Sequence, residues 1–368
     1  MPSAVRRTIG QLLIGSLPGP TIPPELRSLA REFGLGGVIL FARNIEAPEQ
    51  VAELSHDLQE LAAELPLWVS VDQEGGRVAR LKAPFTEWPP MAVLGRSGDA
   101  ALASRFAAAL AAELRAVGIT LDYAPVLDIH TNPKNPVIGD RALAQDADTV
   151  ARLGAAIVRG LQENGVAACG KHFPGHGDTS VDSHLELPIV EHPPDRIRRV
   201  ECVPFRAAVA ADVAFMMTAH VLVPSLDEEK PATLSRRIVS GLLRDELGFE
   251  GVVLSDDLEM RALAATCAVP DAAVQAVAAG CDGVLVCRAQ AQDRARDVDA
   301  QADVLETLVH AVEDGRIPYT RLDAALLRQR RAKERFLAAP VTVGARQPRQ
   351  VVGCDAHARL AEEMARYL

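Results

Sequence analysis

The sequence lacks several features that would assign it to particular classes of protein. It has no run of ~18 consecutive apolar residues, so we expect no transmembrane helix. Its six cysteines form no CxxC pair, and a chain of 368 residues needs no disulfide staples, so we expect free thiols in a reducing cytoplasm. The net charge of −10 argues against nucleic acid as a main partner, because phosphate binding requires clustered lysines and arginines.

The chain also contains no Ser/Gly-rich linker, internal repeat or low-complexity segment. Its length suits either one (β/α)8 barrel of ~250 residues with insertions or two ordinary domains. Near the N-terminus, Arg6 and Arg7 precede a short apolar stretch, which faintly resembles a secretion signal. Because Gln11 interrupts that stretch and no small-x-small cleavage site follows, we expect it to form a first strand instead.

Short apolar runs alternate along the chain with longer stretches rich in Ala, Leu, Glu and Arg. Several runs are apolar throughout, which is typical of parallel strands buried on both faces. We expect strands at Ile9–Leu17, Gly37–Phe41, Leu67–Val71, Ile119–Tyr123, Val166–His172, Val213–Thr218, Gly251–Ser255 and Gly283–Cys287. Helical patterns lie between them at Pro48–Glu64, Asp99–Val117, Ala147–Asn164, Asp195–Ala211, Arg237–Leu247 and Asp271–Gly280.

This alternation predicts an α/β fold, and eight strands favour a closed barrel over an open sheet. We therefore predict a single-domain (β/α)8 TIM barrel with a C-terminal helical extension. The barrel domain is expected to span residues 1–338. Residues 339–368 are expected to form a tail with one short helix, not a separate domain.

Polar residues follow at least five of the predicted strands. They are Asp72 after the third, Asp128 after the fourth, Lys171 and His172 at the fifth, His220 after the sixth and Asp256 with Asp257 after the seventh. The active site of a TIM barrel lies at the C-terminal ends of its strands. As a set, these residues predict an active site there.

The segment KHFPGHGDTSVDSH, residues 171–184, is the densest polar motif. Asp182 and His184 are two positions apart, so in an extended chain their side chains point to the same side. The carboxylate could then hold the imidazole in one tautomer and raise the basicity of its other nitrogen, as a general acid/base requires. An exposed loop histidine beside an aspartate is the alternative.

Asp256 and Asp257 are adjacent carboxylates that should point in different directions. The one directed toward the barrel axis is a candidate nucleophile, whereas the other could cap the following helix. We assign the chemistry to Asp256 and capping or support to Asp257. Asp72, Arg80, Arg141 and Lys171 are candidates for binding sugar hydroxyls or an acidic substituent, with surface salt bridges as the alternative for the two arginines.

Five segments together resemble glycoside hydrolase family 3, and within it the β-N-acetylhexosaminidases of the NagZ type. They are VDQEGGRVAR (Val71–Arg80), VIGDRA (Val137–Ala142), the 171–184 motif, PATLS (Pro231–Ser235) and GVVLSDDLEM (Gly251–Met260). FARNIE (Phe41–Glu46) also fits, and the resemblance covers roughly residues 8–337. The sequence departs from the family at Ala142 and Leu143, where a serine and an aromatic residue are usual.

The resemblance implies a retaining β-N-acetylglucosaminidase that needs no cofactor or metal. Asp256 would be the nucleophile, and His184 with Asp182 would be the acid/base pair in place of the usual second carboxylate. The N-acetylglucosamine ring would be bound by Asp72, Arg80, Arg141, Lys171 and His172. The small carbohydrate substrate would be a muropeptide in cell-wall recycling, and the enzyme would be a cytoplasmic monomer without membrane or nucleic-acid partners.

Three other functions remain compatible with the residues. A metal-dependent TIM-barrel hydrolase could use His172, His176, His184, His220 and Asp256 as ligands. A phosphorylase of the same family would use phosphate in place of water, which a histidine acid/base permits because it repels phosphate less than a glutamate would. A non-catalytic sugar-binding barrel would be expected to lack the nucleophile or the acid/base.

Overall fold

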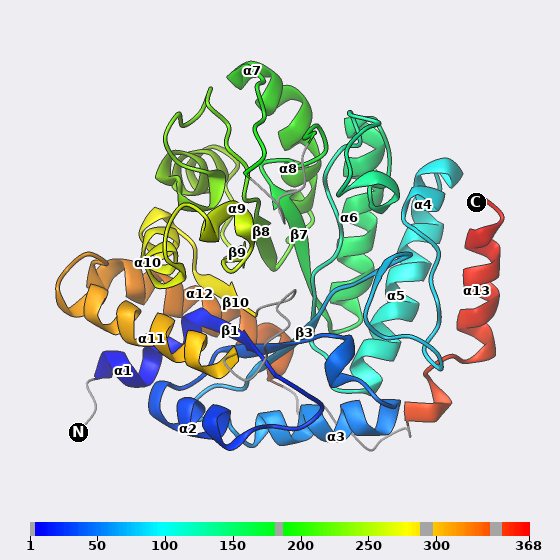
Figure 1. Cartoon of the computed structure of the whole chain (residues 1–368). Coiled ribbons are helices and arrows are strands. Elements are labelled where there is room, and N and C mark those ends of the chain that lie inside the picture. The colour runs from blue at the N-terminus through cyan, green and yellow to red at the C-terminus, as the bar shows by residue number, and fades with distance from the viewer. Residues whose placement is uncertain (1–3, 181–186, 288–296, 339–347) are drawn as a thin grey trace.

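The computed structural model describes residues 4–180, 187–287, 297–338 and 348–368. Eight parallel strands close into a barrel in the order β1-β10-β9-β8-β7-β6-β3-β2, which confirms the predicted TIM barrel (Figure 1). The strands are β1 (Leu13–Ser16), β2 (Gly37–Leu40), β3 (Trp68–Val71), β6 (Leu121–Asp122), β7 (Ala167–Phe173), β8 (Phe215–Thr218), β9 (Val252–Asp257) and β10 (Gly283–Val286).

Helices follow the strands and surround the barrel (Figure 1). They are α2 (Pro24–Phe33), α3 (Pro48–Gln59), α5 (Ala100–Ala116), α6 (Ala147–Glu163), α8 (Cys202–Ala210), the π-helix Arg237–Glu246, α10 (Val269–Ala279) and α11 (Asp297–Glu313). Capping explains two of their starts, because Asp99 accepts hydrogen bonds from the first turn of α5, and Asp146 does so for α6. Gly34 ends α2 with φ of 68°, a conformation that glycine adopts without steric cost.

The first predicted strand begins too early in the sequence. Residues Ile9–Leu12 are helical, with α1 (Ala4–Ile9) and a 3-10 turn (Gly10–Leu12) preceding β1. The segment is buried like a strand, and an apolar run alone does not distinguish a buried helix from a buried strand. Gln11 holds it in place by donating to the carbonyls of Gly34 and Leu35 at 2.7 and 3.2 Å.

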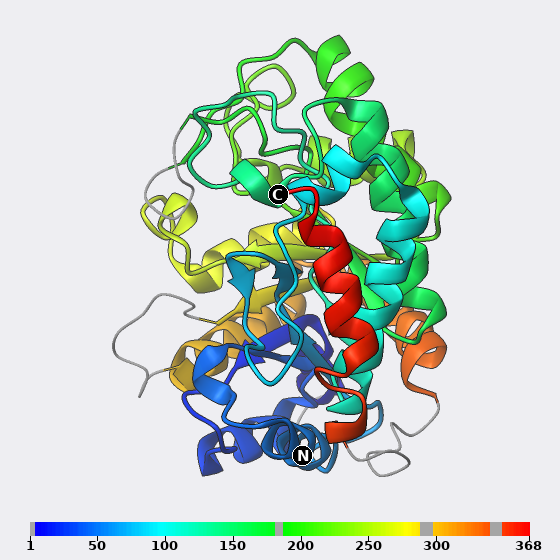
Figure 2. The same cartoon turned by 90° about the vertical axis from the view of Figure 1, so that its right-hand side faces the viewer.

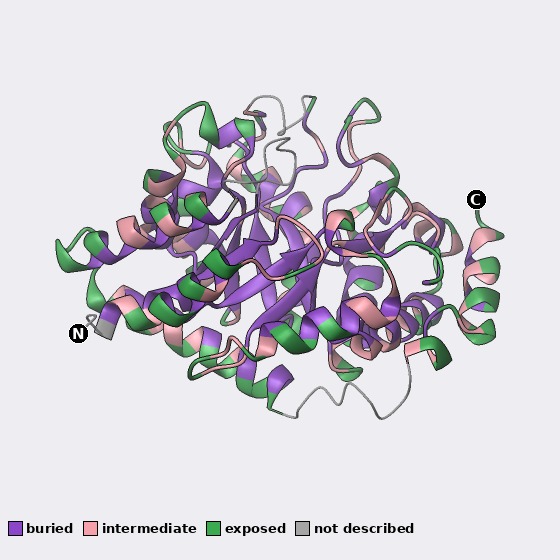
Figure 3. Cartoon of the chain, turned by 60° about the horizontal axis from the view of Figure 1, so that its bottom comes forward, coloured by how far each residue is buried: buried purple, intermediate pink, exposed green. Residues whose placement is uncertain are grey.

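Packed side chains fill the barrel interior, and Figure 3 shows the strands as its buried centre. Trp68 and Phe215 meet edge to face with ring centroids 5.0 Å apart. Below them, Phe336 of α12 (Tyr319–Leu337) lies 6.4 Å from Trp68, so α12 covers the N-terminal end of the barrel. Lys333 of the same helix is buried and donates to Gln11 and Gly36, and burial lowers its pKa to about 7.

The segment beyond residue 347 packs on the outside of the barrel. Helix α13 (Asp355–Ala365) lies against α5 and α4 (Ala92–Ser97), as Figure 2 shows. The buried Glu113 of α5 accepts hydrogen bonds from Gly353 and His357 of this segment, and from Thr86. Within the described ranges, no helix is both long and apolar enough to cross a membrane.

Candidate active site

A cavity of about 420 Å³ opens at the C-terminal ends of the strands. Six residues predicted from the sequence line it together: Asp72, Arg80, Arg141, Lys171, His172 and Asp256. They come from strands β7 and β9 and from the loops after β3 and β6, and they meet because the C-terminal ends of all parallel strands lie at this end of the barrel. Tyr123, Val137, Met217 and Met260 supply apolar and aromatic parts of the wall.

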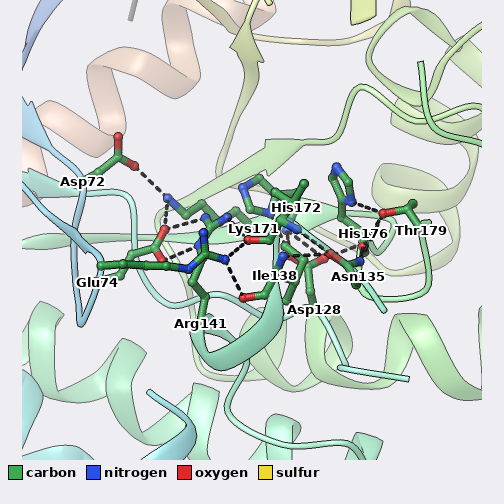
Figure 4. Close-up of polar contacts among 12 residues, drawn as sticks. Asp72, Glu74, Asp128, Asn135, Ile138, Arg141, Lys171, His172, His176 and Thr179 are labelled. Atoms are coloured by element: carbon green, nitrogen blue, oxygen red, sulfur yellow. Dashed lines mark hydrogen bonds and ion pairs between the residues drawn. The ribbon is translucent and has the colours of Figure 1, made fainter. Parts of the chain in front are cut away.

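Lys171 is the centre of a buried ionic network (Figure 4). Its Nζ lies 2.8 Å from Oδ1 of Asp72 and 2.7 Å from Oε1 of Glu74. Glu74 in turn accepts two hydrogen bonds from the guanidinium of Arg141, at 2.9 Å from Nε and 2.8 Å from Nη2. Arg80 contacts the other oxygen of Asp72 at 3.3 Å. The network links β7 to the loop after β3 and to the turn that carries Arg141.

In this network burial favours the neutral forms of the side chains, whereas ion pairing favours their charged forms. Ion pairing has the larger effect on the pKa values. The Glu74 side chain is only 1% exposed. Burial by itself would raise the pKa of Glu74, but the charges of Arg141 and Lys171 hold it well below its usual range. Burial would likewise lower the pKa of Lys171, and the carboxylates of Asp72 and Glu74 raise it instead. All four charges therefore persist at neutral pH.

Glu74 was missed in the sequence analysis, although a signal was present. Asp72 and Glu74 are two positions apart, and Glu74 lies in the short strand β4 (Gln73–Gly75), which pairs with β5 (Val78–Ala79). Residues two apart in an extended chain share a side, and both carboxylates do reach the same lysine.

His172 is held by a second buried carboxylate, Asp128 (Figure 4). Oδ2 of Asp128 lies 2.7 Å from Nδ1 of the imidazole, and Oδ1 accepts a hydrogen bond of 2.6 Å from the backbone amide of His176. Burial would raise the pKa of Asp128, but His172 and the nearby hydrogen bonds lower it. An ionised Asp128 orients the imidazole so that its other nitrogen is available toward the cavity. Asp128 was predicted as one of the polar residues at the strand ends, but its pairing with His172, 44 positions away, was not.

Two further histidines at this end are engaged by hydroxyls. Nδ1 of His176 lies 2.7 Å from Oγ1 of Thr179, and burial lowers the pKa of His176 to about 4. Both ring nitrogens of His220 have partners: Nδ1 lies 2.8 Å from Oγ1 of Thr233 and Nε2 lies 2.9 Å from the carbonyl of Asp257. Neither nitrogen of His220 is therefore free for a metal ion. Among the residues described, no three His, Cys, Asp or Glu side chains are grouped to hold one.

Asp256 and Asp257 both line the cavity, but they have different hydrogen-bond partners. The Asp257 carboxylate accepts from the amides of Glu259 and Cys287, at 3.2 and 3.3 Å, so it supports the loop and the neighbouring strand. Asp256 lines the cavity and accepts only from the backbone amide of Asp257, at 2.8 Å, within the described part of the chain. Burial would raise the pKa of Asp256, but His220, His172 and that amide lower it, whereas burial raises the pKa of Asp257.

The two remaining predicted residues, Asp182 and His184, lie outside the described residues. The chain is described up to Ser180 and again from Leu187. These two ends flank the predicted acid/base motif, and both lie on the loop that follows β7.

An eight-stranded barrel with charged residues converging on a cavity at its C-terminal end has the architecture of a TIM-barrel enzyme. A family model described as the glycosyl hydrolase family 3 N terminal domain matches residues 4–332. The chain belongs to this family and is a glycoside hydrolase.

Its relatives include several proteins named as β-hexosaminidases. Beta-hexosaminidase A of Pseudoalteromonas piscicida is 34% identical, in a match that covers 94% of this chain but only 60% of that relative. A β-N-acetylglucosaminidase structure from Paenibacillus sp. strain FPU-7 is 43% identical with a TM-score of 0.92, covering 99% of this chain and 69% of the other. NagZ of Neisseria gonorrhoeae, solved with N-trifluoroacetyl-D-glucosamine, is 31% identical with a TM-score of 0.79, covering 99% and 98%.

Replacing Glu74 should show how strongly the network depends on its carboxylate. In Glu74→Gln, two buried cations lose a shared counter-charge, so we expect the free energy of unfolding to fall by about 3 kcal/mol or more at pH 7. The pKa of Glu74 is lowered by folding, so its contribution exists above the unfolded carboxyl pKa of ~4.3 and disappears as the pH falls through the folded value. Urea denaturation at pH 7, where the contribution is complete, and at pH 3, where a measurable part of it is lost, measures both effects.

The matched control is Asp140→Asn, which breaks a half-exposed pair with Arg77 on a neighbouring turn. It should cost about 0.5 kcal/mol or less. Equal losses for the two variants at pH 7 would contradict the importance given to the buried network.

Proposed function

We propose that the chain is a retaining exo-β-N-acetylglucosaminidase that hydrolyses terminal non-reducing N-acetyl-β-hexosaminides. One observation carries this proposal: Asp256 lines the same cavity as five side chains suited to binding a sugar ring. The cavity volume of about 420 Å³ falls within the range of small-ligand sites. The names of the relatives, and the N-acetylglucosamine analogue bound to the gonococcal protein, support the choice of sugar.

In the first step, a carboxylate oxygen of Asp256 attacks the anomeric carbon of the bound sugar. A covalent ester to the sugar forms as the glycosidic carbon–oxygen bond breaks, and the leaving oxygen receives a proton from His184. In the second step, His184 takes a proton from water, the water oxygen attacks the anomeric carbon, and Asp256 is released. One water is consumed, and the anomeric configuration is retained because it is inverted twice.

In this proposal His184 works as the acid/base with Asp182 as its partner. An imidazole whose pKa is near ~6.5 can be charged in the first step and neutral in the second at neutral pH. The ring-binding role goes to Asp72, Arg80, Arg141, Lys171 and His172. Lys171 and His172 are held by buried carboxylates, so they would meet the substrate without reorganising, which favours transition-state stabilisation.

We further propose muropeptides as the natural substrate, with the enzyme acting in cell-wall recycling in the cytoplasm as a monomer. These proposals rest on the resemblance to the NagZ-type enzymes. A muropeptide carries an acidic aglycone, whereas a chitin fragment does not. We expect kcat/KM for a muropeptide disaccharide to exceed that for chitobiose, and an equal or lower value would contradict the assignment.

Asp256→Ala should lower turnover of an aryl N-acetyl-β-glucosaminide by ~10³-fold or more, because it removes the carboxylate that is proposed to form the ester. The wild-type chain should also gain the mass of one sugar when incubated with a 2-fluoro substrate analogue, and the variant should not. Intact-mass spectrometry measures this labelling. Asp257→Asn is the neighbouring control, because its carboxylate contacts backbone amides. A loss as large as that of Asp256→Ala would contradict the choice of nucleophile.

His184→Ala should reduce kcat/KM for chitobiose much more than for a nitrophenyl glycoside. A nitrophenolate leaves without protonation, whereas a sugar alkoxide requires it, and general acid catalysis contributes about 10²–10⁴-fold. Steady-state kinetics on the two substrates gives the ratio. An equal loss on both would show that His184 is not the acid.

A further inference from the structure

The segment made of residues 178–192 is joined at its two ends by a direct side-chain contact. Oδ2 of Asp178 lies 2.5 Å from Nε2 of His192, fourteen positions further along the chain. The other oxygen of Asp178 accepts a hydrogen bond of 2.8 Å from the hydroxyl of Thr131. One carboxylate therefore connects both ends of the segment with the loop after β6.

Backbone contacts hold each end of the segment to the barrel as well. On the first side, the Asn132 side-chain amide donates to the carbonyl of Thr179 at 3.2 Å, and that of Asn135 donates to the carbonyl of His176 at 2.7 Å. Both asparagines belong to the loop after β6.

On the second side, the contacts are made to the chain that follows β8. The amide of Val190 donates to the carbonyl of Leu222, and the amide of Leu222 donates to that of Pro188, each at 2.8 Å. The Ser225 hydroxyl donates to the carbonyl of His192 at 2.5 Å. The two ends are thus attached to different parts of the barrel, and the Asp178–His192 contact joins them directly.

We propose that Asp178 and His192 are positioning residues for the acid/base step. This inference rests on the proposed function, because Asp182 and His184 lie between them in the chain. Holding the two ends of a segment together removes many arrangements otherwise open to the residues between them. A catalytic group already held near its reacting position loses less entropy on reaching the transition state.

The location of the pair argues against a purely structural role. Asp178 and His192 are 28% and 18% exposed, and ion pairs near the surface contribute little to stability. Neither residue is among those that line the cavity. Their substitution should therefore leave the nucleophile and the ring-binding residues unchanged and should act through the segment that they close.

Two variants remove the contact, and two conservative variants keep it. Asp178→Ala and His192→Phe should each lower kcat/KM for chitobiose by ~10-fold or more, which is part of the effect of general acid catalysis, while kcat/KM for a nitrophenyl glycoside changes less than ~2-fold. Asp178→Asn should restore most of the loss, because an amide can accept from Thr131 and donate to a histidine nitrogen. His192→Gln can still donate to Asp178 and should likewise be mild.

The double variant Asp178→Ala/His192→Phe provides a second, independent readout. If the two residues act only through their mutual contact, the double variant should lose no more activity on chitobiose than the worse single variant. Losses that multiply would overturn the inference, because each residue would then act separately.

Asp227→Ala is the matched control. Asp227 is also a loop carboxylate that accepts from a hydroxyl, that of Ser235 at 2.6 Å, and from backbone amides, but it lies outside residues 178–192. It should leave the ratio of kcat/KM between the two substrates unchanged. Thermal denaturation checks that each variant is folded, and Thr131→Val offers a milder change should Asp178→Ala unfold, with a smaller shift of the same ratio expected.

The comparison with His184→Ala separates failure of this inference from failure of the proposed function. If His184→Ala shows the leaving-group effect and the Asp178 and His192 variants do not, the inference is overturned and the proposed function stands. If His184→Ala shows no such effect, the proposed function fails and this inference fails with it. Equal losses on both substrates in the Asp178 and His192 variants would also overturn it.

Discussion

The placement of Lys171 between two carboxylates is the constraint on which the rest of the site depends. An ammonium with 3% side-chain exposure is costly to bury, and only counter-charges in direct contact offset that cost. Asp72 and Glu74 supply them, and Arg141 prevents an excess of negative charge at Glu74. These ion pairs therefore hold the loop after β3, strand β7 and the turn around Arg141 in one arrangement.

The adjacent residue His172 belongs to a different hydrogen-bond network. Asp128 contacts the imidazole of His172 and the backbone of His176, and His176 continues to Thr179. Asn135 reaches the same region through Thr179. The loop after β7 is thus tied to the loop after β6 along its first residues. The His172 imidazole and the residues that follow it up to Thr179 are therefore held by one hydrogen-bonded network that reaches the loop after β6.

Much of the fold was predictable because its pattern is local. Each buried parallel strand is a short apolar run, and each polar cluster follows such a run, so both the barrel and the end that carries the site can be read along the chain. The same local pattern gave a wrong strand prediction at Ile9–Leu12, where the apolar stretch is helical. The pairings of Glu74 with Arg141 and of Asp128 with His172 were not predicted, because these partners lie 67 and 44 positions apart in the sequence.

A comparison of two carboxylates shows why Asp256, rather than Asp282, is the proposed nucleophile. Asp282 precedes β10 at the N-terminal end of the barrel, is fully buried, and contacts Arg244, Arg321 and Arg328 as well as the amide of Val253. Its carboxylate oxygens already have ion-pair and hydrogen-bond partners within the protein, which suits a residue that attaches helices to strands.

Asp256 lies at the opposite end of the neighbouring strand β9, yet within the described residues it forms no salt bridge with lysine or arginine and accepts one backbone amide. A carboxylate engaged by three arginines is a poor nucleophile, because its lone pairs are occupied and attack would separate it from its counter-charges. A carboxyl group beside a barrel strand does not by itself single out Asp256, since Asp282 also has one. Asp256 differs because it lines the cavity and, among the described residues, accepts a single hydrogen bond, from the amide of Asp257.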